Sequence, residues 1–336
     1  LWFLAKPLAF AGAWRLAAGF SRHGWVRTSA ALAYALFPAL AIAQAEGSLG
    51  GLFAAVALPW LAAELLAIAG VSVTARQSSQ SLWSRVGAAG LLTAGITAAA
   101  PSIAPVIVVL LVLLALVKLR RLGYLMWVGL PLAAVFVPLA FFATANLGHP
   151  ALVLADPGVA TNSPDLIALV TANSGLWIIS LAPLALLSVF ALLSSRWLSS
   201  LLGWLLAIVA TATAWTLGLL DFADGSSPSR LPLLALAGLG LTIAALAMLE
   251  TLAEFDPKAR RGRRPMHYVL AATAVLAPLS LSLFAPLDSS LRFTDGAVQP
   301  SIVSAQAAHG EQLRTLELSV LKPAADQTAR FSVQLQ

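Results

Sequence analysis

The chain has 336 residues, of which 60% are hydrophobic and only 10% are charged, and its mean hydropathy is +0.88. Soluble domains carry about 25% charged residues, so this composition excludes a soluble globular protein, a disordered chain and a nucleic-acid-binding domain. The absence of cysteine excludes disulfides, thiolate metal sites and cysteine nucleophiles. A polytopic, all-α membrane protein remains, and its lipid bilayer is the first expected partner.

The chain begins inside an apolar run at Leu1 and stops inside a strand-like run at Gln336. We therefore expect a piece of a longer protein. Residues 1–287 are predicted to be a multi-spanning transmembrane domain that lacks its N-terminal part. Residues 288–336 are predicted to begin a small extracytoplasmic domain.

Ten segments are apolar enough to be predicted as spans, since a membrane-crossing helix needs about 20 mostly apolar residues. They are residues 1–20, 28–45, 51–74, 86–99, 105–117, 122–145, 175–195, 198–220, 231–249 and 267–286.

The fourth and fifth spans come from one apolar stretch, 86–117, which is too long for a single span. Pro101 and Pro105 interrupt it, and a helix usually ends at or before the residue that precedes a proline. We predict two short spans; one kinked or re-entrant element is the alternative.

Charges alternate between successive loops of this map. Fourteen of the 20 basic residues fall in every second loop: Arg15, Arg22, Arg27, Arg76, Arg85, Lys118, Arg120, Arg121, Arg196, Lys258, Arg260, Arg261, Arg263 and Arg264. The other loops carry Glu46, Asp156, Asp165, Asp221 and Asp224, with Arg230 as their only basic residue. Basic loops face the cytoplasm in multi-pass proteins, so we expect a plasma-membrane protein with its acidic loops and C-terminal tail outside. The alternation holds only if ten spans are counted.

Residues 288–336, the tail, differ from the rest of the chain in their pattern of apolar and polar residues. Residues 301–310 are helix-like, whereas 313–321 and 329–335 alternate apolar and polar residues with the period of a strand. Residues 322–328 form the turn between them. We predict a small domain of mixed α and β structure.

Candidate chemistry is confined to a few residues, because no phosphate-binding loop, dinucleotide fingerprint, metal-spaced histidine pair or nucleophile elbow is present. With Arg15 counted in the first loop, Lys6 and Glu64 are the charged residues inside the spans, and such residues are functional candidates by default. Glu64 is a candidate proton acceptor or headgroup contact. The alternative is a structural role, in which it pairs with Lys6 or a hydroxyl, or reaches out to the interface.

The outward loops supply the other candidates. The longest loop carries His149, Asp156 and Asp165, and long irregular loops are often binding loops; the alternatives are a simple turn at 156–158 and a helix start at 163–165.

Two further outward loops carry carboxylates. Asp221 and Asp224, three residues apart, are able to bind a divalent metal or act as a base and its orienting partner, or they are solvated at a helix end. Glu46, in a tight turn, is able to reach a lipid phosphate through a metal.

Several short segments resemble the membrane region of large family-2 glycosyltransferases of high-GC Gram-positive bacteria. They are Ala31-Leu32-Ala33-Tyr34-Ala35-Leu36-Phe37-Pro38, Glu46-Gly47-Ser48-Leu49-Gly50, Leu58-Pro59-Trp60, Ala100-Pro101-Ser102 with Ala104-Pro105, Leu154-Ala155-Asp156-Pro157-Gly158 and Arg314-Thr315-Leu316. That membrane region is itself similar to the GT-C arabinofuranosyltransferases, which use polyprenyl-phosphate sugars.

The resemblance implies a GT-C-like bundle that transfers sugar during cell-envelope polysaccharide assembly, with a lipid-linked donor and a polysaccharide acceptor as partners. It implies an outward carboxylate as general base, helped in some cases by a divalent metal; no other cofactor is indicated. The family's usual acid and its cytoplasmic nucleotide-sugar domain would precede Leu1, so catalysis is not assigned to this piece alone.

The residues that the resemblance favours are few. Glu46 and Asp156 are the catalytic candidates, and His149 would line a groove for the donor or acceptor. Substrate-binding candidates are His149, Asp165, Glu64, Asp221 and Asp224.

Two other functions remain open: a transporter or flippase for a lipid-linked sugar, and a non-catalytic membrane anchor. The lack of a convincing inverted repeat and the few buried charges argue against a transporter.

Overall fold

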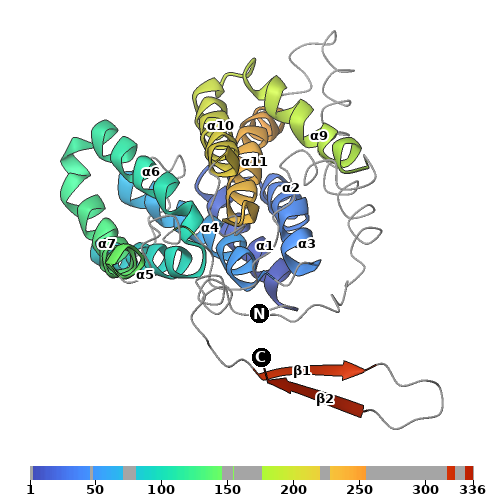
Figure 1. Cartoon of the computed structure of the whole chain (residues 1–336). Helices are drawn as coiled ribbons and strands as arrows, with labels where there is room; N and C mark the ends of the chain where they lie inside the picture. The colour runs from blue at the N-terminus through green and yellow to red at the C-terminus, as the bar shows by residue number, and fades with distance from the viewer. Residues whose placement is uncertain are drawn as a thin grey trace.

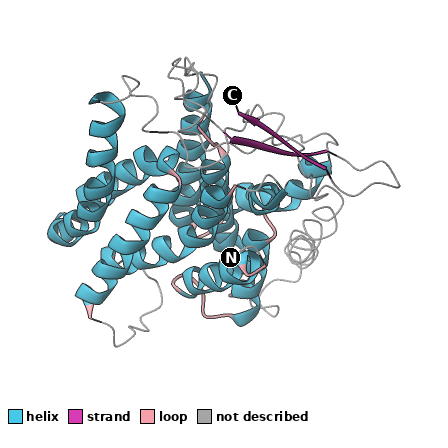
Figure 2. Ribbon diagram, turned by 60° about the horizontal axis from the view of Figure 1, so that its bottom comes forward, coloured by secondary structure: helices cyan, strands magenta, loops and turns pink. Residues whose placement is uncertain are grey.

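The computed structural model describes residues 3–45, 48–70, 81–145, 154, 176–219, 228–254, 316–321 and 330–335. This part of the chain is almost entirely helical, as Figures 1 and 2 show. The predicted helical membrane bundle is confirmed at that level. The helices are α1 (Ala5–Ala18), α2 (Gly24–Ala35), α3 (Pro38–Ala45), α4 (Leu49–Ala69), α5 (Leu82–Ala99), α6 (Ala104–Val117), α7 (Leu122–Ala145), α9 (Leu176–Ala191), α10 (Trp197–Leu219) and α11 (Leu231–Ala253), with short 3-10 turns η1 (Pro101–Ile103) and η2 (Leu119–Arg121).

Local sequence sets the ends of α4 and α5. The Ser48 hydroxyl accepts a hydrogen bond from the Gly51 backbone N–H at 3.2 Å, and Ser81 does the same for Ser84. Both are N-caps that satisfy an otherwise unpaired amide. α4 ends at Gly70, whose φ of +65° is the left-handed conformation that glycine adopts without strain.

The described residues contain four helices long and apolar enough to cross a membrane: Leu49–Ala69, Leu119–Phe141, Trp197–Leu217 and Leu231–Ala253. The number rises to six if each of two bent pairs is one span, namely Gly24–Ala35 with Pro38–Gln44 and Leu82–Ala99 with Pro101–Leu116. Ten spans are therefore not confirmed. α1 and α9 are 14 and 16 residues long, short of a full crossing, and the predicted span at 267–286 lies outside the described residues.

The predicted break in the 86–117 stretch is confirmed. α5 ends at Ala99, η1 follows, and α6 begins at Ala104. The directions of the two helical parts differ by 118°. The chain therefore turns back at the two prolines and does not continue as one straight span.

α11 lies at the centre of the bundle and contacts α2, α3, α4, α9 and α10. Two groups of helices lie outside it: α5, α6 and α7 on one side, and α9 and α10 on another (Figure 1). α10 and α11 approach each other closely. A Cβ added at Gly203 would lie 2.5 Å from the Gly240 carbonyl oxygen, and one at Gly240 would lie 2.5 Å from that of Gly203. Only glycines permit this backbone contact, a common device of membrane helix pairs.

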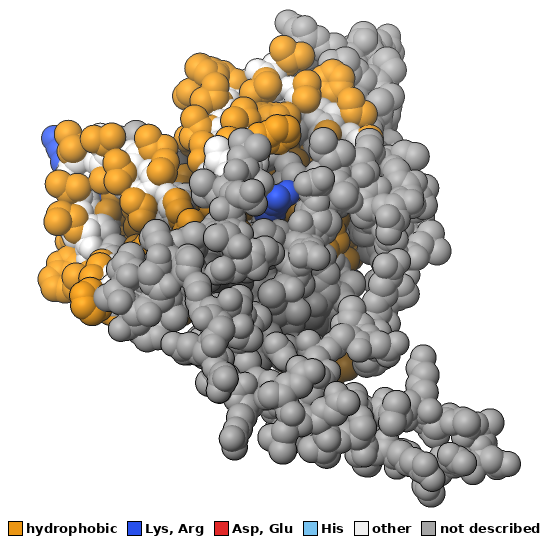
Figure 3. Space-filling model, viewed as in Figure 1, with side chains coloured by type: hydrophobic (Ala, Val, Ile, Leu, Met, Phe, Trp, Pro, Cys, Tyr) orange, Lys and Arg blue, Asp and Glu red, His pale blue; other side chains and the backbone are white. Residues whose placement is uncertain are grey.

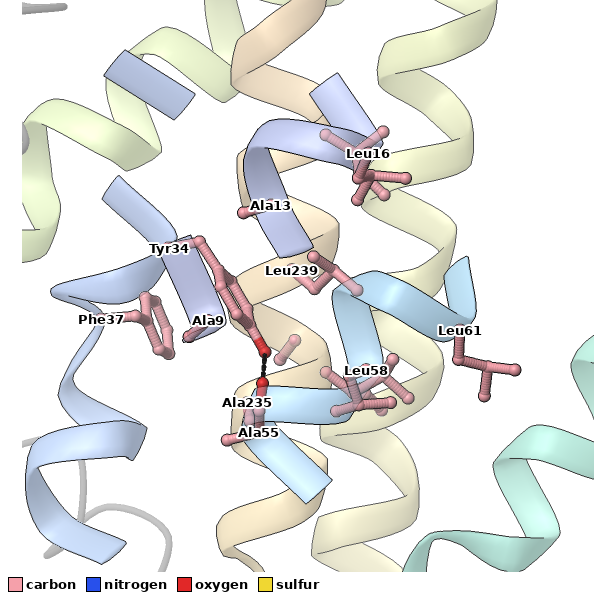
Figure 4. Close-up of a cluster of buried hydrophobic side chains, with 14 of the residues drawn as sticks. Ala9, Ala13, Leu16, Tyr34, Phe37, Ala55, Leu58, Leu61, Ala235 and Leu239 are labelled. Carbon is pink, nitrogen blue, oxygen red and sulfur yellow. Dashed lines mark hydrogen bonds between the residues drawn. The ribbon is translucent and has the colours of Figure 1, made fainter. Parts of the chain in front are cut away.

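A second set of contacts joins α1, α2, α4 and α11. The fully buried Tyr34 of α2 donates its hydroxyl to the Ala55 carbonyl of α4 at 2.6 Å, and Figure 4 shows it among apolar residues of all four helices. Phe37 fills the space beside Gly238 of α11, where a Cβ would lie 2.6 Å from its ring. A buried hydroxyl needs such a partner, so Tyr34 fixes α2 against α4.

Two strands occur in the tail, β1 (Leu316–Leu321) and β2 (Arg330–Leu335), and they pair antiparallel with Leu316 opposite Leu335. They fall within the two segments whose alternation predicts strands. The helix-like segment 301–310 lies outside the described residues. The α/β domain as a whole stays a prediction.

Candidate functional site

Most of the sequence-predicted site residues lie outside the described part of the chain. These are Glu46, His149, Asp156, Asp165, Asp221 and Asp224. Their catalytic and binding roles stay predictions. Among the described residues, no group of three or more His, Asp or Glu side chains is placed to hold a metal ion.

Glu64 is the candidate that the structure places. It lies near the end of α4 with 7% of its side chain exposed. Arg15 of α1 donates a hydrogen bond from Nη2 to its Oε1, and Nη1 of Arg85 from α5 lies 3.6 Å from Oε2. Two arginines from neighbouring helices therefore flank one buried carboxylate. This Arg15–Glu64–Arg85 group is called the arginine cluster below.

The predicted alternatives for the partner of Glu64 were wrong. The partner is neither Lys6 nor a hydroxyl, and the side chain does not reach out to solvent. Lys6 lies in the first turn of α1, whereas Arg15 follows it by about two and a half turns. Arg15 therefore lies at the other end of α1, where it meets Glu64. The charge pattern counts Arg15 with a loop, although Arg15 lies inside both the predicted span 1–20 and α1, which continues to Ala18.

Trp60 fixes the position of the arginine cluster. It lies one turn before Glu64 on α4, and the Arg15 guanidinium carbon lies 5.7 Å from the centre of its ring. Its indole N–H donates to the Leu8 carbonyl at 3.2 Å. The ring also occupies the space beside Gly12, where a Cβ would lie 2.5 Å from Nε1. Arg15 is thus held from two sides, by a carboxylate and by an aromatic face.

A second buried carboxylate, Glu250, lies near the end of α11 with 6% of its side chain exposed. Nδ1 of His23 lies 3.5 Å from Oε2, and Nη2 of Arg196 lies 4.0 Å from Oε1. Arg196 also donates to Glu254, one turn further along. We call this the histidine cluster.

Glu250 is not among the residues predicted from the sequence, because the predicted span ends at residue 249. A signal was present: the apolar residues Leu252 and Ala253 continue the run beyond Glu250, and α11 extends to Ala253. A carboxylate inside such a run is a candidate by the same rule that selected Glu64.

The two clusters lie at the same end of the bundle. Arg15 is near the end of α1, and His23 directly precedes α2, so one short connection joins the clusters. The ends of α1, α4 and α11 and the starts of α2, α5 and α10 therefore meet on one face. These connections are among those that the charge pattern assigns to the cytoplasm. The assignment of this face to the cytoplasm stays a prediction.

Aromatic side chains mark the same level on the outside of the bundle. The Trp83 ring contacts those of Tyr124 and Trp127, with centroids 5.2 and 6.4 Å apart. Trp83 and Trp127 are more than half exposed. Trp83 precedes Arg85 by two residues on α5. Exposed tryptophans of this kind collect at the membrane–water interface.

No protein-family model, curated protein or solved structure matches the chain. The resemblance to glycosyltransferase membrane regions therefore rests on the short segments alone.

Proposed function

We propose that this chain is the membrane module of a glycosyltransferase that acts in cell-envelope polysaccharide assembly with a polyprenyl-phosphate-linked sugar. One observation carries the proposal: three of the segments that resemble that family lie on helices that contact one another. Tyr34, from the first segment, donates its hydroxyl to the Ala55 carbonyl of α4, the helix that also carries Leu58-Pro59-Trp60. At the other end of α4, the backbone of Gly50 approaches that of Ala99, which directly precedes Ala100-Pro101-Ser102. The segments of α2, of α4 and of the break between α5 and α6 therefore belong to one packed unit.

The surface supports a lipid-embedded module. Apolar side chains gather over α6 and α7 and over α9 and α10 (Figure 3). Large exposed ones include Leu116, Met126, Val137, Phe141, Leu186, Val189, Leu202, Ile208 and Trp215. A soluble monomer rarely exposes so much contiguous apolar surface, whereas lipid tails cover it without cost.

The proposed chemistry needs an outward carboxylate. Glu46 or Asp156 removes the proton from the acceptor hydroxyl as its oxygen forms a bond to the anomeric carbon of the sugar. The bond between that carbon and the lipid phosphate breaks, and the phosphate departs with the bonding electrons. Glu64 belongs to a different place. About 24 Å of helix separates Glu64 from Ser48, the N-cap at the start of α4. Ser48 follows Glu46 by two residues in the sequence. We therefore assign Glu64 to the arginine cluster and leave it out of the transfer site.

The test uses the protein that contains this chain, in membranes supplied with a radiolabelled polyprenyl-phosphate sugar and a polysaccharide acceptor. We expect Asp156→Asn or Glu46→Gln to lower transfer by about 10²- to 10⁴-fold, the usual contribution of a general base. Asp326→Asn, in the predicted turn of the tail, is the control and should leave transfer unchanged. Full transfer by an Asp156→Asn, Glu46→Gln double variant would remove both residues from the site.

The main competitor is a flippase for the lipid-linked sugar. Proteoliposomes that move the lipid-linked sugar across the bilayer without transferring it would favour this function. Glu64 and Glu250, the buried carboxylates of the described spans, both lie in ion pairs at one end of the bundle. They do not form a relay across it, which speaks against proton coupling. If the protein neither transfers the sugar nor translocates the lipid-linked sugar, the function of a membrane anchor remains.

The finer topology belongs to the same proposal: ten spans, with the basic face in the cytoplasm and the tail outside. Because the chain has no cysteine, single cysteines are clean probes. Arg22→Cys and Ser195→Cys should react with an impermeant maleimide only from the cytoplasmic side, and Ser226→Cys only from outside. Labelling of the first two from opposite sides would overturn the proposed arrangement.

A further inference from the structure

We propose that the arginine cluster binds the phosphate of a membrane lipid at the interfacial end of α1, α4 and α5. Arg15 supplies the donors, Arg85 adds charge, and Glu64 and Trp60 hold Arg15 in place. This proposal does not depend on glycosyl transfer and applies equally to a transporter or an anchor.

The first step is the charge balance. Two guanidinium groups surround one carboxylate, so the cluster keeps one net positive charge. Both guanidinium groups contact the same carboxylate and therefore lie within about one Debye length of each other. Glu64 is too deeply buried to meet a ligand itself. Its negative charge offsets one of the two positive charges within this group of three residues.

The second step is the supply of donors. A guanidinium has five N–H donors, and among the described residues Arg15 uses Nη2 for Glu64. The Arg15 side chain is 41% exposed, so it is accessible to a ligand. A planar guanidinium matches two phosphate oxygens at once, which an ammonium group does not.

The third step is preorganisation. A free arginine loses about 2 kcal/mol of rotamer entropy when it is fixed. Here the bond to Glu64 and the face of Trp60 already restrict Arg15 before any ligand arrives. The cost of ordering the side chain is therefore met by the fold, and a ligand gains more of its interaction energy as affinity.

The fourth step is depth in the bilayer. α4 and α5 run antiparallel with Gly50 against Ala99 at one end and Glu64 beside Arg85 at the other. Each helix covers fourteen residues between these contacts, or about 21 Å. The arginine cluster therefore lies at an end of the helices. Trp83 and its aromatic neighbours mark this level as the interface, where lipid phosphates lie.

The test measures lipid binding to the purified 336-residue chain in neutral detergent by native mass spectrometry. Three probes separate the sources of phosphate: short-chain phosphatidylglycerol, the matching diacylglycerol without phosphate, and inorganic phosphate. We expect only phosphatidylglycerol to bind. Arg15→Gln should weaken that binding about tenfold, the value of one charge-assisted hydrogen bond. Arg15→Lys should weaken it by about threefold, because lysine keeps the positive charge but lacks the planar pair of N–H donors that matches two phosphate oxygens.

Arg22→Gln is the matched control, since it removes an exposed arginine from the connection after α1 and should change binding by less than about twofold. An equal loss in Arg22→Gln and Arg15→Gln would mean general charge attraction and overturn the site. Unchanged binding in Arg15→Gln, or inorganic phosphate binding as tightly as the lipid, would overturn it too. The Arg15→Gln, Glu64→Gln double variant guards against misfolding, because it leaves no unpaired buried carboxylate. It should bind as weakly as Arg15→Gln, and wild-type affinity in the folded double variant would again overturn the site.

Discussion

α11 and the span that α7 provides are alike in sequence character but opposite in environment. Leu231–Ala253 and Leu119–Phe141 each have 23 residues and similar hydropathy, yet 94% of the first span's window is buried and only 17% of the second's. In a membrane, lipid is as apolar as a protein core, so hydropathy alone gives a helix no reason to be buried. Small residues make the difference. α11 presents Gly238 to Phe37 and Gly240 to α10, whereas a Cβ at Gly129 of α7 would meet only Leu111 at 3.9 Å.

The largest expected effect is therefore at the α10–α11 contact. Gly240→Ala places a Cβ 2.5 Å from a backbone oxygen that cannot move without shifting α10. We expect a loss of about 3 kcal/mol in unfolding free energy, the upper range for overpacking. Thermal unfolding in detergent measures it. Gly129→Ala is the control in the outer group and should be neutral or slightly stabilising, because alanine has the higher helix propensity. Equal losses in the two variants would break the contrast between the helices.

The histidine cluster offers a second contrast, between two carboxylates that share Arg196. Glu250 has 6% of its side chain exposed and Glu254 has 49%. Glu250→Gln should cost about 2 kcal/mol, because it removes the buried charge that His23 and Arg196 face. Glu254→Gln should cost about 0.5 kcal/mol or less, as exposed ion pairs do. Raising the salt concentration should diminish only the second effect. The reverse order would show that the cluster does not tie α11 to α10 and the α1–α2 connection.

A smaller effect is expected from a single hydroxyl. Tyr34→Phe removes the donor to the Ala55 carbonyl and leaves that oxygen buried, at a cost of about 1 kcal/mol. Tyr124→Phe, in the outer group beside Trp83, should change the unfolding free energy by much less, because the Tyr124 side chain is only partly buried. Unfolding curves of the two variants side by side give the comparison. A neutral Tyr34→Phe would mean that α2 is held by apolar packing alone.

Some features followed from local sequence because their causes are local. Pro101 and Pro105 break the long apolar stretch, since proline lacks an amide proton and clashes with the preceding turn. The tail strands follow from their alternation. Two charged residues near helix ends were less well placed: Arg15 was counted with a loop although it lies in α1, and Glu250 was left outside a span that ended at 249 although it lies in α11. Charged residues were counted as loops there, whereas each is accommodated in a helix by a partner from another element.

The sequence by itself determined that this is a helical membrane protein, where its apolar segments lie, and which connections carry positive charge, because composition and charge act through the solvent and the bilayer. The tertiary structure decided which helices are buried and which face lipid, since close packing depends on which glycines meet. It also decided the partners of the buried carboxylates. Arg15 and Glu64 are 49 residues apart, and His23 and Glu250 are 227 apart. No local pattern joins such residues. Only the packing of α1, α4, α5 and α11 brings the opposite charges into contact, and this contact offsets the desolvation cost of burying the carboxylates.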